Sequence, residues 1–279
     1  MSKEKVVLEE KKPMMTAKEE ISNYTAKAQK ALTLFEDYTQ EQVDHIVHEM
    51  ALAAMEQHMP LAKMAVEETG RGVYEDKCIK NMYAAENIWH SIRKNKTVGI
   101  IEDNKVDQIM KVAAPVGVVA GIIPTTNPTS TTIFKAMICT KTRNPIIFSF
   151  HPSAEKCSAA TAKVVYDAAI KAGAPADCIQ WVEGVSMEKT AELINHPEVA
   201  VVLATGGAAM VKAAYSTGKP ALGVGPGNVP AYIEKTANIK RAVNDIIVSK
   251  TFDNGMICAS EQAAIVDSEI YDEVKKEFQ

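Results

Sequence analysis

The sequence predicts an α/β protein, with a parallel sheet covered by helices on both faces and a helical region before it. Two observations predict this fold. From about residue 115 onward, short β-branched apolar segments alternate with segments of helical periodicity, the pattern of βαβ units. Residues 16–95 instead carry apolar residues at helical spacing. At 279 residues, the chain is long enough for one large or two ordinary domains.

The helical region is predicted from its start and stop signals. Thr16–Glu19 has the pattern of a capping box, and Thr39 is placed to cap a second helix. A third helix is expected to start at Pro60 and to stop at Gly70, because proline favours the first turn and glycine the end. A fourth helix is expected over residues 74–93.

The α/β region is predicted from short apolar runs that are typical of strands buried on both faces. The run at 115–123 is of this kind, further strands are expected at 145–149, 178–182 and 199–204, and 229–233 is expected to continue as a strand after the glycine-rich stretch. Helices are expected between them, at 129–140, 153–172, 187–195 and 208–217.

The composition is that of a globular protein and excludes several functional classes. Apolar residues make up 47% of the chain and charged residues 24%. The net charge of −4 gives no long-range attraction to nucleic acid or to an anionic membrane. No apolar run approaches the roughly 20 residues of a membrane span. We therefore expect neither a nucleic-acid nor a membrane partner.

The cysteines and the N-terminus indicate a cytoplasmic location. The five cysteines are widely spaced and form no Cys-x-x-Cys pair, which argues against a disulfide framework and against a zinc site. Residues 1–12 mix Lys and Glu and lack the apolar segment of a secretory signal. We expect residues 1–15 to be a flexible arm and expect no metal site in this chain.

Three loops follow predicted strands, at the sheet edge where α/β proteins bind ligands. Residues 123–131 hold two prolines and Asn127, and a simple helix cap with turn prolines is the alternative reading. Residues 203–207 end in Thr-Gly-Gly before a helix, which suits a phosphate or an ordinary turn. Residues 223–228 fit the dinucleotide fingerprint poorly, because the spacing is wrong and a strand follows. We read them as a glycine-lined surface against which another segment packs.

Cys258 is the candidate nucleophile. It follows the turn dipeptide Asn254-Gly255 and is expected to be exposed in a loop. The other four cysteines lie in or near predicted helices and strands, where a free cysteine is usually a small core residue. No histidine pairs with Cys258 in the sequence, so its thiolate needs amide donors or a bound cation.

Taken together, these segments resemble the aldehyde dehydrogenase superfamily from about Thr16 to the end of the chain. The resemblance is strongest to the CoA-acylating acetaldehyde dehydrogenases, including the N-terminal part of bifunctional aldehyde–alcohol dehydrogenases. In this superfamily the dinucleotide lies across a Rossmann-like sheet without the usual glycine fingerprint. The segments that carry the resemblance are 123–132, 141–149, 203–207, 219–230 and 250–262.

The resemblance implies roles for individual residues. Cys258 matches the catalytic nucleophile, and Asn127 matches the amide that forms the oxyanion hole together with the N–H group of the cysteine. Ser149 lies near the position where hydrolytic relatives place a lysine on the adenosine ribose, which leaves the preference between NAD and NADP open. The residues implied in cofactor binding are Pro124, Thr125, Thr126, Ser149, Thr205, Gly206, Gly207 and Gly225.

One departure from the hydrolytic relatives bears on the reaction. Those enzymes carry a Glu-Leu-Gly-Gly motif whose glutamate activates water, and residues 223–226 of this chain hold no carboxylate. The resemblance therefore implies release of the acyl group to CoA, with interconversion of acetaldehyde, CoA and NAD with acetyl-CoA and NADH in fermentative ethanol metabolism. A non-catalytic nucleotide-binding or assembly fragment and a propionaldehyde dehydrogenase remain as alternatives.

The resemblance also implies a domain organisation and an assembly. Residues 16–250 are expected to be a helical region plus an NAD-binding domain, and residues 251–279 the start of a truncated catalytic domain. Iron is expected only in a further C-terminal domain of the parent enzyme, outside this chain. A homo-oligomer is expected, and a filamentous assembly is possible for the full-length parent.

Overall fold

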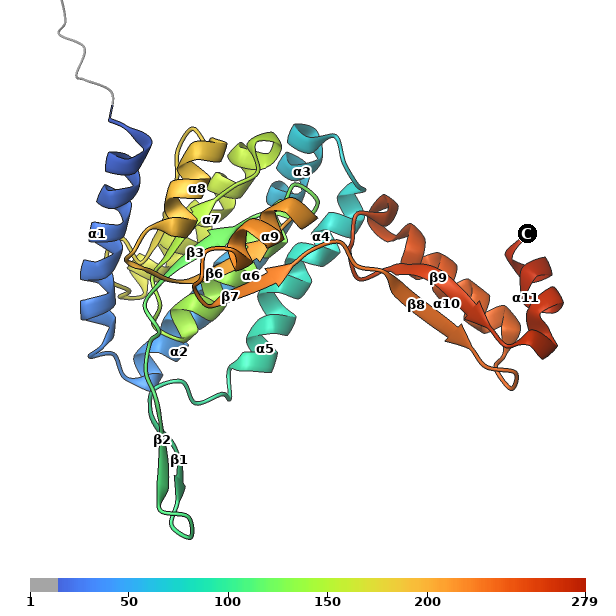
Figure 1. The fold of residues 1–279 in the computed structure, drawn as a ribbon, viewed down its shortest axis with the longest axis horizontal. Coiled ribbons are helices and arrows are strands. Elements are labelled where there is room, and N and C mark those ends of the chain that lie inside the picture. The colour runs from blue at the N-terminus through green and yellow to red at the C-terminus, as the bar shows by residue number, and fades with distance from the viewer. Residues whose placement is uncertain (1–14) are drawn as a thin grey trace, which may run out of the picture.

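The structure, a computed structural model, describes residues 15–279 and has a parallel sheet at its centre (Figure 1). The predicted arm therefore lies, except for Met15, outside the described residues. All neighbouring strands of the sheet run parallel, in the order β5-β4-β3-β6-β7. The strands are β3 (Val118–Ile122), β4 (Ile146–Ser149), β5 (Ile179–Trp181), β6 (Val199–Thr205) and β7 (Ala221–Val224). The predicted α/β fold class is confirmed.

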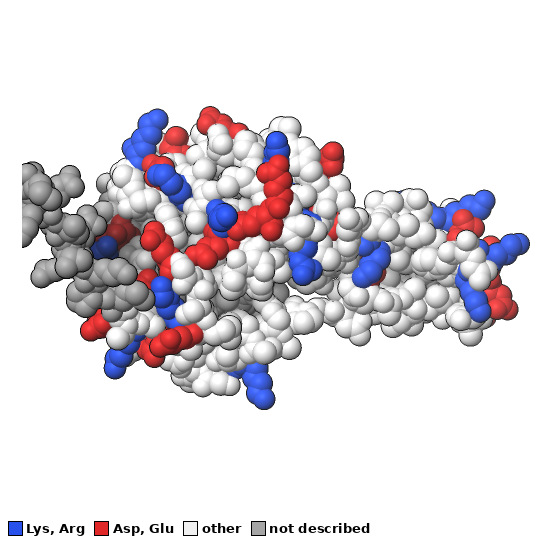
Figure 2. All heavy atoms as spheres, turned by 90° about the horizontal axis from the view of Figure 1, so that it is seen from above, with Lys and Arg blue, Asp and Glu red and all other residues white. Residues whose placement is uncertain are grey.

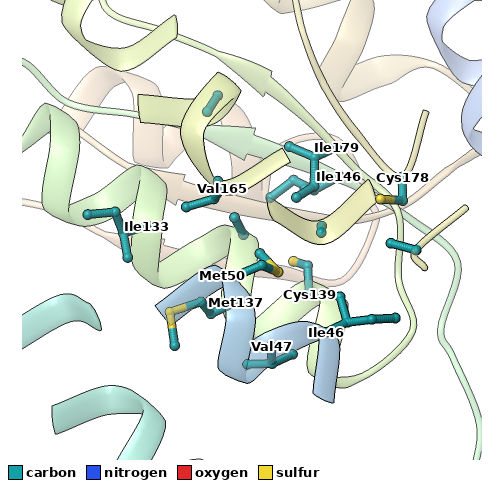
Figure 3. Packing of buried hydrophobic residues seen from close by; sticks show 14 of the residues in the cluster. Ile46, Val47, Met50, Ile133, Met137, Cys139, Ile146, Val165, Cys178 and Ile179 are labelled. Carbon is teal, nitrogen blue, oxygen red and sulfur yellow. The ribbon is translucent and has the colours of Figure 1, made fainter. Parts of the chain in front are cut away.

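The two faces of the sheet are covered by different helices. On one face, α6, α7 and the N-terminal helix α2 (Gln40–Glu56) pack over residues such as Val119, Ile146 and Phe148. Figure 3 shows Ile146 among the side chains of these helices. On the other face, α1, α8 and α9 pack over Ala120 and Ile147. Consecutive strand residues thus face opposite cores, which explains why these strands are continuously apolar in sequence. The helices that follow strands are α6 (Pro128–Lys141), η2 (Pro152–Ala154), α7 (Glu155–Lys171), α8 (Met187–Asn195) and α9 (Ala208–Tyr215).

The N-terminal helices form as their capping signals predict. Thr16 and Thr39 each make both hydrogen bonds of a capping box. The third helix starts at His58, so the predicted start at Pro60 is wrong by two residues. The N–H groups of the first helical turn have no partner inside the helix, and proline, which lacks this group, is therefore tolerated at any position of that turn. The elements are α1 (Ala17–Phe35), α2 (Gln40–Glu56), α3 (His58–Thr69), α4 (Tyr74–Met82), the π-helical turn η1 (Tyr83–Asn87) and α5 (Ile88–Ile92).

A long β-hairpin leaves the body between the helical region and the sheet (Figure 1). Its strands, β1 (Gly99–Asn104) and β2 (Ile109–Ala113), are antiparallel, and most of their residues are exposed. The sequence pattern did not predict this hairpin, because neither strand has a buried face to impose an alternation of apolar and polar residues.

The last fifty residues form an extension beside the body (Figure 1). Strands β8 and β9 pair in parallel, and Ile233, Val243 and Val274 form a small separate core. By their packing, the residues from 229 onward form one unit. The domain boundary expected between residues 250 and 251 stays a prediction. The elements are β8 (Val229–Ile233), α10 (Ile239–Thr251), η3 (Phe252–Gly255), β9 (Glu261–Val266), η4 (Ser268–Ile270) and α11 (Tyr271–Phe278).

The surface carries both signs of charge. On the face shown in Figure 2, acidic and basic side chains are interspersed over the body, and the inner part of the extension is largely uncharged. Among residues 15–279, no helix is both long and apolar enough to cross a bilayer. Within the same range, no group of three or more His, Cys, Asp or Glu side chains is placed to hold a metal ion.

Candidate active site

A cleft of about 490 Å³ opens at the carboxyl ends of the central strands, between the body and the extension. Strands β3 and β6 are neighbours from which the chain continues in opposite directions across the sheet, so the cleft lies at the topological switch point. Its lining includes nine of the ten residues predicted for the site: Pro124, Thr125, Thr126, Asn127, Thr205, Gly206, Gly207, Gly225 and Cys258. The structure therefore brings Asn127 and Cys258, which are 131 residues apart in sequence (258 − 127), to one place.

Ser149 is the predicted site residue that the structure does not bring to the cleft. It ends β4, is 1% exposed, and its hydroxyl lies 2.8 Å from that of Thr190. The side chain thus already has a hydrogen-bond partner inside the protein. Ser149 does not line the cleft, and its proposed contact with the cofactor stays a prediction.

Asn127 stands at the N-cap position of α6, but its side chain makes no capping hydrogen bond. The amide is used elsewhere. Its Oδ1 accepts a hydrogen bond of 2.7 Å from Lys80 Nζ, and its Nδ2 donates to Thr126 Oγ1 at 3.0 Å. The alternative reading of this loop, a helix cap with turn prolines, is therefore wrong for the asparagine side chain.

Cys258 is exposed in a loop, as predicted, and reaches the cleft from the extension. The turn before it is unusual, since Asp253, Asn254 and Gly255 all have positive φ angles of 51°, 53° and 71°. Asp253 is fully buried and holds this turn in place. Its carboxylate accepts hydrogen bonds from Val73 N at 2.7 Å, from Lys77 Nζ at 3.1 Å and from Lys80 Nζ.

Gly227 explains the glycine-lined stretch that precedes β8. A Cβ atom at this position would lie 2.6 Å from the carbonyl oxygen of Cys258. The segment that packs against Gly227 is therefore the nucleophile loop itself, whereas Gly223 packs against Val211 and Tyr215 of α9. Only a residue without a side chain allows the two backbones to meet here.

The remaining cysteines differ from Cys258 in environment. Cys139, Cys157 and Cys178 are buried, and burial raises the pKa of each thiol to about 12. Cys78 is half-buried, and desolvation raises its pKa as well. Such thiols stay protonated near neutral pH and are poor nucleophiles, and Cys258 is the one cysteine of the five that is exposed.

Lys135 lies directly beneath the cleft and was not predicted. Its Nζ donates hydrogen bonds of 2.7 Å to the carbonyl oxygens of Ile122 and Leu203, near the ends of β3 and β6. Burial without a carboxylate partner lowers the pKa of Lys135 to about 7. This side chain thus joins the carboxyl-terminal parts of β3 and β6, because one ammonium group bonds a carbonyl oxygen of each strand.

Several groups in the cleft suit a nicotinamide dinucleotide. Thr125 Oγ1 is buried with no hydrogen-bond partner in the described chain, so it is free for a ligand. A Cβ at Gly207 would meet nothing within 4 Å, and Gly206 and Gly225 are nearly as open, which lets a ligand approach the backbone. The α9 N-terminus, which begins at Ala208, favours an anionic group such as a phosphate. The residues present therefore fit the cofactor.

The side chains that line the cleft include no Asp, Glu, Lys or Arg among the described residues. Of these described side chains, His151 is the one imidazole. His151 Nδ1 accepts a hydrogen bond of 3.1 Å from Ser153 N. Sequence patterns did not single out His151, Lys80, Lys77 or Asp253, because single polar residues on amphipathic helices and turns ordinarily face solvent.

Comparison with known proteins agrees with this arrangement. The profile of the aldehyde dehydrogenase family matches residues 10–279. Aldehyde-alcohol dehydrogenase 2 of Entamoeba histolytica is 62% identical over 95% of this chain and 31% of that protein. The bifunctional aldehyde-alcohol dehydrogenase AdhE of Escherichia coli K12 is 50% identical over 93% of this chain and 29% of that protein.

Solved structures give the same result. An acetylating aldehyde dehydrogenase from Geobacillus thermoglucosidasius has a TM-score of 0.90 and 53% identity, covering 94% of this chain and 58% of that one. A propionaldehyde dehydrogenase from Rhodopseudomonas palustris, with bound CoA and an acylated cysteine, has a TM-score of 0.81 and 32% identity, covering 92% of this chain and 58% of that one. The chain thus spans about a third of the curated relatives and somewhat over half of the solved chains. The chain belongs to the aldehyde dehydrogenase family.

Proposed function

We propose that this chain carries the nucleophile and cofactor site of a CoA-acylating aldehyde dehydrogenase, which interconverts acetaldehyde, CoA and NAD with acetyl-CoA and NADH. The observation that supports it most is the meeting of Cys258 and Asn127 in one cleft with an open, glycine-lined floor and no carboxylate. Because the curated relatives are much longer, activity, substrate and partners are proposed for the whole protein to which the chain contributes.

In the proposed reaction Cys258 thiolate adds to the aldehyde carbonyl carbon, and the carbonyl oxygen becomes an oxyanion. The Nδ2 group of Asn127 and the backbone N–H of Cys258 donate hydrogen bonds to that oxygen. The nicotinamide ring, when bound, supplies the hydride acceptor that no side chain of the cleft provides. Pro124–Thr126, Thr205 and Gly206–Gly207 hold this cofactor at the strand ends, and Gly225 lines the same wall.

The acyl group is then held as a thioester on Cys258 Sγ, and its release decides the product. Attack by water needs a general base, and the lining of the cleft offers no carboxylate among the described residues. A thiol of CoA is already a good nucleophile, so it displaces the cysteine sulfur and leaves as acyl-CoA. The Cys258 thiolate is regenerated in that step, and the proton of the CoA thiol is released to solvent.

Acetaldehyde is the preferred substrate in this proposal because the relatives at 62% and 50% identity are aldehyde-alcohol dehydrogenases. Propionaldehyde dehydrogenases of known structure are less similar, at 27–32% identity. A role in ethanol fermentation, a cytoplasmic location, NAD over NADP, and a homo-oligomer belong to the same proposal. Iron would bind in a separate alcohol dehydrogenase domain of the parent, not in this chain.

The test is NADH formation from acetaldehyde, CoA and NAD, measured for this chain and for a longer polypeptide that contains it. We expect CoA-dependent NADH formation, acetyl-CoA as product rather than acetate, and complete loss in Cys258→Ala. Retained turnover in Cys258→Ala would contradict the proposal, as would acetate formed without CoA. Binding of NAD with no turnover in either polypeptide would identify the chain as a nucleotide-binding module instead.

A further inference from the structure

We propose that Lys80 is a positioning residue of this site, which aims the amide of Asn127 and ties it to the loop that carries Cys258. The inference rests on the proposed function and adds to it a side chain outside the cleft lining. Lys80 lies on α4, in the helical region, far in sequence from both partners.

The ammonium group of Lys80 is saturated with partners from two segments that are far apart in sequence. Lys80 is 9% exposed, and its Nζ donates to Asn127 Oδ1 at 2.7 Å, to the Met256 carbonyl at 2.7 Å and to Asp253 Oδ2. An ammonium group has three N–H donors, so every one is used. One acceptor lies in the loop after β3, and the other two lie in η3 and directly after it, in the segment that leads to Cys258.

Lysine chemistry fixes the orientation of the Asn127 amide. An ammonium group can only donate hydrogen bonds, so the atom of Asn127 that faces Lys80 must be the carbonyl oxygen. The NH₂ group is thereby turned away from Lys80. One of its hydrogens goes to Thr126 Oγ1, and the other remains for a ligand in the cleft. A cation at the amide oxygen also polarises the group and makes its N–H a stronger donor.

The same ammonium group fixes the position of the nucleophile loop. Met256 lies two residues before Cys258, and its carbonyl is bonded to Lys80. Asp253 in turn holds the left-handed turn, and Gly72 is pressed against it, since a Cβ at Gly72 would lie 2.1 Å from Asp253 Oδ1. The two donors proposed for the oxyanion lie on Asn127 and on Cys258. The ammonium group of Lys80 therefore holds both, the first by a direct hydrogen bond and the second through the Met256 carbonyl.

Lys77 offers a matched control in the same cluster. It is 2% exposed, lies one helical turn earlier on α4, and its Nζ donates to Asp253 Oδ2 and to the Thr126 carbonyl, both at 3.1 Å. It makes no described hydrogen bond to the Asn127 side chain. Lys77→Met therefore removes a buried cation bonded to the same carboxylate while leaving the amide of Asn127 in contact with Lys80.

The first experiment is a double-mutant cycle on the acylating reaction. We expect Lys80→Met to lower kcat roughly 10²-fold, as loss of an oxyanion donor does, with a small change in KM for NAD. The loss in Lys77→Met should be at least ten times smaller. In an Asn127→Ala background, Lys80→Met should cost clearly less than in the wild type, because the part of its effect that acts through Asn127 is already lost and only the part that acts through the nucleophile loop remains. Equal losses in the two lysine variants, or additive losses with Asn127→Ala, would overturn the proposal.

The second experiment does not need turnover. In protein labelled with ¹⁵N-asparagine, the side-chain NH₂ signals of Asn127 are identified by their absence in Asn127→Asp. We expect Lys80→Met to shift these signals and Lys77→Met to leave them nearly unchanged; an unshifted pair in Lys80→Met refutes the orienting role. If Lys80→Met does not fold, Lys80→Arg, which keeps the charge but places its donors differently, should also shift these signals, and unshifted signals in that variant would refute the orienting role. A wild-type protein without acyl-CoA formation would refute the proposed function alone, since the NMR result still decides the role of Lys80.

Discussion

At the scale of single residues, the cleft depends on buried polar groups whose charge is set by their surroundings. Lys135 has no carboxylate partner and donates to two strand-end carbonyls, whereas Lys77 and Lys80 share Asp253. Desolvation lowers the pKa of Lys80 too, but the Asp253 carboxylate opposes that shift. Burial therefore lowers the pKa of both Lys135 and Lys80, and only Lys80 has a carboxylate that opposes the shift.

Lys135 predicts a pH-dependent contribution to stability. Its pKa is about 7 in the folded protein, below the ordinary 10.5, so between these values the unfolded chain binds a proton that the folded chain does not. Stability should then rise with pH over this range, by roughly 1 kcal/mol per pH unit. We expect the free energy of unfolding of the wild type to increase relative to Lys135→Met between pH 7 and 9.5, measured by urea denaturation. A difference between the two proteins that stays constant with pH would contradict the assignment.

At the scale of elements, the site is built from loops that leave parallel strands and meet a loop of the extension. The backbones of Gly227 and the nucleophile loop approach closely, because the Cys258 carbonyl packs on the glycine. In η3, which precedes Cys258, the backbone of Asp253 is left-handed. A non-glycine residue with positive φ is held by its surroundings, here by hydrogen bonds to α4 and the loop before it. The nucleophile loop is thus defined by its contacts and not by its own conformational preference.

Gly227→Ala should displace this loop. The added methyl would overlap the Cys258 carbonyl, and overpacking of this kind costs about 1–3 kcal/mol. We expect a change of at least several-fold in the rate at which iodoacetamide modifies Cys258, followed by mass spectrometry of the Cys258 peptide. Gly207→Ala is the steric control, since its Cβ meets no atom within 4 Å and should leave that rate unchanged. Equal rates in wild type and Gly227→Ala would show that the loop yields freely.

At the scale of the whole molecule, the cleft lies between two units, and a buried ion cluster joins them. Asp253 comes from the extension side and is fully buried against Lys77 and Lys80 of the body. Surface ion pairs such as Arg241–Asp245 are largely exposed and contribute little. The position of the extension relative to the sheet should therefore be sensitive to Asp253 and insensitive to Asp245.

Asp253→Ala should loosen the extension. The substitution leaves two buried lysines without their carboxylate, and breaking a buried pair costs about 3–5 kcal/mol. We expect faster amide hydrogen exchange over residues 229–279 than in the wild type, with β3 and β6 less affected. Asp245→Ala removes an exposed carboxylate from α10 and should change the same exchange rates very little. Unaltered exchange in Asp253→Ala would show that other contacts hold the extension.

Much of this molecule follows from local sequence. The capping boxes at Thr16 and Thr39 and the continuously apolar strands are encoded by neighbours a few residues apart, so the helices and the parallel sheet could be predicted. Cys258 and the strand-end loops could also be identified, since turn residues and glycines mark them. The exposed hairpin of β1 and β2 could not, because no buried face patterns its sequence.

The roles of Lys80, Asp253 and Lys135 were decided only by tertiary structure. In sequence, Lys77 and Lys80 look like ordinary charged positions of an amphipathic helix, and Asp253 looks like a turn residue. Their meeting at one buried point depends on how α4 packs against η3 across more than 170 residues. The sequence by itself determined which side chains can react, since chemistry belongs to residue types. Their geometry and their protonation were decided by the fold, because burial and long-range contacts set both.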